Sequence, residues 1–254
     1  MAAAGGGNSG AWGAGRSRRR DRAELALAYG LILAVIWSAR PLQRYLWMTA
    51  VAALAGMITL EAWGDGRAWR DAMGLRRENF LKSVWVTGVA LVLAGVTIAC
   101  SVRMGTMRNT PHGFVDFVRT YWGYALWTFV QQFLMLGFFL SRIRRLMGSG
   151  VRAAVATAVI FALAHVPNPI LAPLTLVWGL AACFLFLHYR NLYPLAMAHA
   201  VLGITVAIAV PGPVVHNMRV GLGYLTYRQH AHAGAQNSRS ALATTAPAVK
   251  TPNN

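Results

Sequence analysis

Acidic residues are scarce in this chain, and more than half of the chain has none. Only seven Asp and Glu occur among 254 residues, and none occurs between Phe117 and Asn254. Cysteine is equally scarce, since only Cys100 and Cys183 are present. Two isolated cysteines inside apolar runs indicate neither a disulfide framework nor a thiolate metal site. Any carboxylate that acts in the second half must therefore come from the first half.

Charged residues of either sign make up only 12% of the chain, whereas hydrophobic residues make up 56%. The mean hydropathy is +0.45, which is far above that of an ordinary soluble domain. Apolar runs long enough to cross about 30 Å of hydrocarbon predict an all-α, polytopic transmembrane helix bundle of about seven spans, with an eighth left open. The runs cover residues 24–39, 45–63, 83–102, 120–141, 151–167, 170–189 and 192–211.

The formal net charge of +17 raises the question of nucleic acid binding. The arginines, however, stand at the ends of the apolar runs and are not interleaved with aromatic residues on one soluble face. This placement is typical of topology determinants, so we expect contact with membrane lipids and none with nucleic acid. The alternation of basic loops predicts a multi-pass cell-membrane protein with a cytoplasmic amino terminus. It also places Arg142, Arg144 and Arg145 in the cytoplasm.

Composition divides the chain into three parts. Residues 1–23 are rich in Gly and Ala and then in Arg, which predicts a disordered cytoplasmic arm. Residues 24–215 form the predicted transmembrane domain. Residues 229–254 contain few bulky apolar side chains, which predicts a disordered tail. Within the domain, residues 64–82 have the spacing of a short helix lying in the membrane interface.

Two adjacent glutamines, Gln131 and Gln132, stand inside the apolar run and are the most unusual feature of the sequence. Placing two amides in hydrocarbon costs several kcal/mol unless other helices supply hydrogen-bond partners. His165 and His199 are the imidazoles that follow at mid-segment depth. We therefore expect these four side chains, from three different spans, to form one buried polar cluster.

Three short patterns carry these residues on successive spans. They read QQFLML at 131–136, FALAH at 161–165 and HAVLG at 199–203. Their order and spacing resemble the CPBP family, also called Abi, which includes the type II CAAX prenyl endopeptidases and bacteriocin-processing proteins. The resemblance covers about residues 120–215.

The family pattern is E-E-x-x-x-R, then F-x-x-x-H, then H-x-x-x-N. The resemblance implies a bundle of about eight helices around a polar cavity, where a glutamate and histidines activate water to cleave a peptide bond. It also implies a peptide or protein substrate, lipidated in some members, and a zinc ion that His165 and His199 would help to bind. By position, the family's acids, arginine, histidines and final amide fall on Gln131, Gln132, Leu136, His165, His199 and Gly203. Phe161, His165 and His199 match the pattern.

The departures from this pattern bear on the chemistry. An amide cannot take a proton from water, so Gln131 cannot act as the base that the resemblance assigns to a glutamate. The remaining candidates for a base are His165, His199 and Glu61, an acid near the end of the second span. Catalytic zinc usually has three protein ligands, and this core offers two histidines. We expect His188 and His216, near span ends, to be interface residues.

Three functions remain open on the sequence alone. The first is a CAAX protease-like intramembrane peptidase, in which His165 and His199 act on water that Gln131 and Gln132 position. The second is a non-catalytic family member that binds hydrophobic or lipidated peptides in the same cavity. The third is a transporter or channel, which the lack of an internal repeat disfavours.

Overall fold

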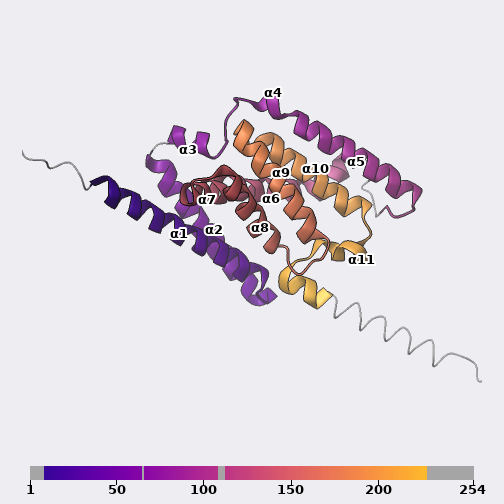
Figure 1. Cartoon of the computed structure of the whole chain (residues 1–254). Coiled ribbons are helices and arrows are strands. Elements are labelled where there is room, and N and C mark those ends of the chain that lie inside the picture. Colours follow the sequence, from indigo (N-terminus) through magenta and orange to yellow (C-terminus); the bar gives the residue numbers. More distant parts are fainter. Residues whose placement is uncertain (1–8, 65, 108–111, 228–254) are drawn as a thin grey trace, which may run out of the picture.

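The computed structural model describes residues 9–64, 66–107 and 112–227, and helices joined by short turns account for them (Figure 1). The all-α prediction is confirmed. The main helices are α1 (Ser9–Ile36), α2 (Arg40–Gly64), α5 (Trp85–Arg103), α6 (Phe114–Gln132), α7 (Leu140–Met147), α8 (Gly150–Leu163), α9 (Leu171–Tyr189) and α10 (Tyr193–Ala209). Shorter elements are α3 (Gly66–Ala72), α4 (Phe80–Ser83), α11 (Gly212–Val215) and a 3-10 turn (His216–Met218). Figure 1 shows α1 and α2 along one side of the bundle, α5 along the opposite side, and α6 to α10 between them.

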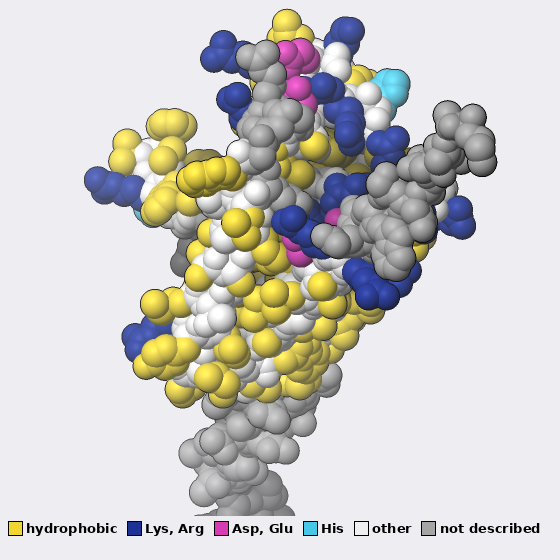
Figure 2. All heavy atoms as spheres, turned by 90° about the vertical axis from the view of Figure 1, so that its left-hand side faces the viewer, with side chains coloured by type: hydrophobic (Ala, Val, Ile, Leu, Met, Phe, Trp, Pro, Cys, Tyr) yellow, Lys and Arg dark blue, Asp and Glu magenta, His cyan; other side chains and the backbone are white. Residues whose placement is uncertain are grey.

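Length and composition identify three helical stretches of the described chain as able to cross a membrane. They are Phe80–Arg103, Phe114–Met147 and Leu171–Tyr189. Figure 2 shows basic side chains gathered over the upper part of one face, with acidic ones among them, above a surface of hydrophobic side chains. These long apolar helices indicate an integral membrane protein.

Each of the seven predicted runs lies in a helix, but several bounds differ. The apolar helices α8 and α10 have 14 and 17 residues, fewer than the roughly 20 that a full span needs. The count of seven full spans is therefore not reproduced by length. The predicted interfacial helix within 64–82 corresponds to α3, which is followed by a loop and α4.

The predicted disordered arm differs most from the structure. Helix α1 begins at Ser9, so residues 9–23 are helical. Ion pairs explain part of this order, because Asp21 is buried and bonds to Arg145 of α7. The predicted disordered tail over 229–254 lies outside the described residues.

Helices α6 and α7 form one continuous rod through a π-helical segment, Phe133–Phe139. Its wider turn is seen where the Leu140 N–H donates to the carbonyl of Met135, five residues earlier. Gly137 faces Met73, whose Sδ would lie 2.9 Å from a Cβ added at position 137. The absence of a side chain at Gly137 thus lets the loop after α3 pack against the rod.

The helices that carry the predicted site pack closely. Gly179 of α9 lies against α8, since an added Cβ would be 3.2 Å from Cα of Ala158 and 3.5 Å from Phe161. The start of α8 is capped by the Ser149 hydroxyl, which accepts from the N–H of Arg152. The core between these helices is apolar and includes Phe138 and Phe186. Polar groups inside it therefore need specific partners.

Candidate functional site

The last residue of α6 meets the second turn of α10 in the interior of the bundle. The side-chain amide nitrogen of Gln132 lies 2.8 Å from Nδ1 of His199. Gln132 is fully buried and His199 is 9% exposed. When the amide donates, Nδ1 of His199 accepts, and the proton of the neutral imidazole then stands on Nε2. In this arrangement, His199 offers one N–H donor to a ligand.

His165 has the opposite arrangement. Its Nδ1 lies 2.8 Å from the carbonyl oxygen of Phe161. A carbonyl can only accept, so Nδ1 carries the proton and Nε2 of the neutral ring keeps a lone pair. His165 stands just after α8 ends at Leu163, where the negative end of the helix favours a positive charge. The residue can therefore accept a proton or bind a cation.

The ring of Phe161 packs against both histidines. Its centroid lies 4.9 Å from that of His165 and 6.1 Å from that of His199, with the rings edge to face in both cases. The indole of Trp178, from α9, lies 5.8 Å from the His199 ring at an angle of 34°. Residues from α6, the end of α8, α9 and α10 thus converge around one imidazole pair.

The two glutamine side chains lie in different surroundings. Gln132 contacts His199, whereas Gln131 is half-buried and makes no hydrogen bond within the described part of the chain. Leu136, at the position of the family's arginine, is fully buried in the core. Glu61 belongs to α2, but its side chain lies outside the described residues. The structure therefore brings together Gln132, Phe161, His165 and His199 from the predicted set.

Gly203 faces Tyr124, a residue that no motif in the sequence marks. A Cβ added at Gly203 would meet the Tyr124 hydroxyl oxygen first, and it would lie 2.8 Å from the Cε1 and Cζ atoms of the same ring. The tyrosine thus fills the space beside Gly203, one helical turn after His199. A small residue one turn after a buried histidine is a signal for a large neighbour, but it does not say which helix supplies that neighbour.

Several buried polar atoms near the histidines have no hydrogen-bond partner among the described residues. Oε1 of Gln132 and Nε1 of Trp178 belong to residues that contact His199. The hydroxyl of Thr157, one turn before Phe161 on α8, is also without a partner. Such atoms each cost about 1–3 kcal/mol when they stay unpaired. An acceptor and a donor next to His199 are therefore available to a polar ligand.

The donor set does not fit a three-ligand catalytic zinc site. Among the described residues, no group of three or more His, Cys, Asp or Glu is close enough to hold one metal ion. His188 packs on Tyr189 instead, and His216 packs on Tyr224. Two imidazoles and an amide are thus the groups that this core presents.

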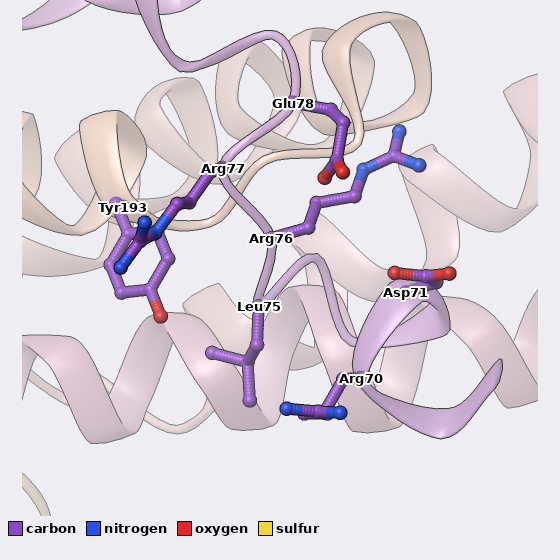
Figure 3. A pocket seen from close by; sticks show the side chains of 7 residues that line it. All are labelled: Arg70, Asp71, Leu75, Arg76, Arg77, Glu78 and Tyr193. Carbon is purple, nitrogen blue, oxygen red and sulfur yellow. The ribbon is translucent and has the colours of Figure 1, made fainter. Parts of the chain in front are cut away.

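A pocket of about 430 Å³ opens at the start of α10. It is lined by charged side chains and two others, namely Arg70, Asp71, Leu75, Arg76, Arg77, Glu78 and Tyr193. Figure 3 shows Arg77 extending toward the Tyr193 ring. Nε of Arg76 donates to the carbonyl of Arg190 at 2.9 Å. Tyr193 stands six residues before His199, or about 9 Å along the helix axis.

Positive charges crowd this end of the molecule. Burial of the Arg190 guanidinium, together with the charges of Arg144 and Arg76, lowers the pKa of Arg190 below its ordinary value. Because these three cations repel one another, the pocket lies in a region of positive potential. A group with negative charge would be attracted to it.

The comparisons agree with the motifs. The family model of Rce1-like type II CAAX prenyl endopeptidases matches residues 110–205. This match, which covers less than half of the chain, supports the resemblance to the CPBP family. No curated protein and no solved structure matches it. The CPBP region contains α6, α7, α8, α9 and most of α10, and it therefore includes Gln132, His165 and His199.

Proposed function

We propose that this CPBP-like chain is an intramembrane peptidase that cleaves a membrane-proximal peptide bond and uses a histidine, not a carboxylate, as the base. The observation that carries the proposal is the difference between the two imidazoles around Phe161. His165 keeps a lone pair at Nε2, because its Nδ1 donates to a carbonyl. His199 is fixed through Nδ1 by Gln132, and its Nε2 can donate. One ring is thus set to accept a proton and the other to donate a hydrogen bond.

The proposed reaction uses these two roles in sequence. Nε2 of His165 takes a proton from water as the water oxygen attacks the carbonyl carbon of the peptide. The electron pair of the C=O double bond moves to the oxygen, and N–H of His199 stabilises the negative charge there. The C–N bond then breaks, and the proton on His165 passes to the leaving nitrogen. The products are a carboxylic acid and an amine.

Water and peptide would reach the site from the basic end of the bundle. The pocket beside Tyr193 lies at the start of the helix that carries His199. In the orientation that the arginines favour, this end faces the cytoplasm and the amino terminus is cytoplasmic in the cell membrane. The family model bears the name of CAAX prenyl endopeptidases, so a prenylated peptide is the first substrate to test.

A cleavage assay with His165→Ala tests this function. The full chain in lipid nanodiscs is given a fluorogenic prenylated peptide ending in a CAAX sequence and, separately, an unlipidated transmembrane peptide. We expect the parent to cleave one of them and the variant to lose about 10²–10⁴-fold in rate, as loss of a general base commonly does. His188→Ala is the matched control, since this imidazole packs on Tyr189 away from Phe161. Equal rates in the parent and His165→Ala would contradict the proposal.

Gln131 and Gln132 stand where the family pattern has two glutamates, and this favours a second candidate function. In it, the chain is a non-catalytic CPBP protein that binds lipidated or hydrophobic peptides. Amides are good hydrogen-bond partners for a peptide and poor bases. In that case the prenylated peptide binds, no cleavage occurs at any pH, and Gln132→Leu weakens binding. Cleavage by the parent excludes this candidate.

A further inference from the structure

One face of α6 points polar side chains at α10. Tyr124, Thr128 and Gln132 are four residues apart and therefore share this face. Gln132 bonds to His199, and Tyr124 packs on Gly203. Gly203 follows His199 by four residues, or about 6 Å along α10. The two contacts show that the helices run antiparallel here and that Tyr124 lies one turn from the imidazole.

Thr128 is not available to a ligand, but Tyr124 is. The Thr128 hydroxyl is buried and donates back to the carbonyl of Ala125 at 2.8 Å. The Tyr124 hydroxyl makes no hydrogen bond with any described residue, although the ring is held firmly against Gly203. A phenol with an unused O–H, one helical turn from an imidazole with an unused N–H, gives the site a second donor.

A second observation indicates that a polar ligand belongs at this place. Gln132 is fully buried, and its Oε1 has no partner among the described residues. Nε1 of Trp178, whose ring packs on His199, is also buried and unpaired. Unpaired donors and an unpaired acceptor around one imidazole are complementary to a peptide group, which has one carbonyl oxygen and one N–H.

We propose that the hydroxyl of Tyr124 donates a hydrogen bond to the carbonyl oxygen of the peptide group that is bound beside His199. This inference rests on the proposed function for its substrate class and adds a residue to the reaction. When water attacks, the oxygen becomes negative, and Tyr124 and His199 both donate to it. Gly203 is the partner that makes this possible, because any side chain at 203 would displace the tyrosine ring.

The test uses a ¹³C-labelled peptidyl ketone that the chain cannot cleave, bound to the full-length protein in nanodiscs. A hydrogen bond to the ketone oxygen lowers its infrared stretching frequency. We expect this shift in the parent and its partial loss in Tyr124→Phe, which keeps the Cε1 and Cζ atoms of the ring beside Gly203 and removes the oxygen atom. Tyr121→Phe is the matched control, because Tyr121 lies on the same helix and packs on Phe117.

Turnover of the prenylated peptide gives an independent readout. Tyr124→Phe should lower kcat by about 10²-fold with little change in KM, because a donor to the developing oxyanion acts mainly in the transition state. Gly203→Ala should move the ring and lower kcat as well, and adding Tyr124→Gly to Gly203→Ala should not restore it.

The outcomes separate this inference from the proposed function. A ketone shift that is partly lost in Tyr124→Phe supports the inference even where the parent cleaves nothing, and in that case only the peptidase proposal fails. The same shift in the parent and Tyr124→Phe overturns the role of Tyr124 whether or not cleavage occurs. Failure of the ketone to bind the parent overturns it too, because the site then accepts no peptide carbonyl.

Discussion

The rod formed by α6, the π-helical segment and α7 carries two buried polar clusters of opposite kind. At its middle, the amide–imidazole cluster (Gln132, His165 and His199 around Phe161) is made of neutral groups. Ten residues after Gln132 begins the ion-pair cluster, in which Arg142 and Arg145 of α7 pair with Glu24 and Asp21 of α1. Nε and NH2 of Arg142 lie 2.9 Å and 2.8 Å from Oε2 of Glu24. Arg142 is fully buried and stacks 3.5 Å above the Phe138 ring.

The comparison shows how a chain with few acids distributes them. No acid follows Asp116 in the sequence, so a carboxylate can reach the second half only through a tertiary contact. Between helices, Glu24 contacts Arg142 and Asp21 contacts Arg145, and Glu24 also pairs with Arg20 on its own helix. The interior cluster has amides where the family has acids, and it needs no counter-ion. Charge is therefore used to attach α1, and hydrogen bonding is used to arrange the site.

Removing the charge of Glu24 from the ion-pair cluster should have the largest effect on stability. Glu24→Gln removes the carboxylate that lies 2.8 Å from the buried Arg142 guanidinium, and breaking a buried ion pair commonly costs about 3–5 kcal/mol. Unfolding by sodium dodecyl sulfate in mixed micelles measures the loss. Asp116→Asn is the control, because Asp116 is exposed in the first turn of α6.

A double variant sharpens this result. Glu24→Gln combined with Arg142→Met removes both charges and should regain a large part of the stability. If the free energy of unfolding of the single Glu24→Gln variant lies within about 0.5 kcal/mol of that of the parent, the ion pair does not hold α1 in place.

Breaking the amide–imidazole cluster should have a smaller effect. Gln132→Leu leaves Nδ1 of His199 buried without its partner, which costs about 1–3 kcal/mol. Gln131→Leu, on the neighbouring half-buried residue without a hydrogen bond, should be close to neutral. The same unfolding assay compares them. If the two leucine variants behave alike, the hydrogen bond of Gln132 is not what stabilises this part of the core.

The smallest effect is expected at the exposed edge of the ion-pair cluster. Asp21→Asn removes a carboxylate that bonds to Arg145, whose side chain is 48% exposed and can be hydrated. Such pairs contribute about 0–1 kcal/mol. The loss should shrink further at high salt, because exposed charges are screened. If Asp21→Asn lowers the free energy of unfolding as much as Glu24→Gln does, the exposed and the buried ion pair contribute equally, and the distinction between them is wrong.

Much of the fold could be predicted because apolar runs determine helices in a membrane protein. The ends of the helices could not be predicted where tertiary contacts determine them. Residues 9–23 look like a polar arm, yet Asp21 and Glu24 gain partners on α7 that lie over a hundred positions away in the chain. At the other end of the domain, α8 ends at Leu163 although the apolar run continues to 167.

The candidate site could be predicted in part for a related reason. Glutamine and histidine stand out in apolar runs, so Gln132, His165 and His199 were visible from sequence. Which glutamine faces His199 depends on the rotation of α6, and neighbouring residues on a helix point about 100° apart. Tyr124 and Trp178 were missed because a Tyr or Trp in a membrane helix is ordinary, and only the packing on Gly203 and His199 shows their place.

The π-helical segment Phe133–Phe139 sets the phase between the two halves of the rod. Its hydrogen bonds join residues five apart instead of four, so the segment holds one more residue than a regular α-helix and rotates α7 relative to α6. Deleting one residue there would let the rod continue as a regular α-helix while turning every later side chain to a new direction. The chain could then keep the contact of Gln132 with His199 or that of Arg142 with Glu24, but not both. Substitutions in this segment should therefore be tolerated far better than changes in its length.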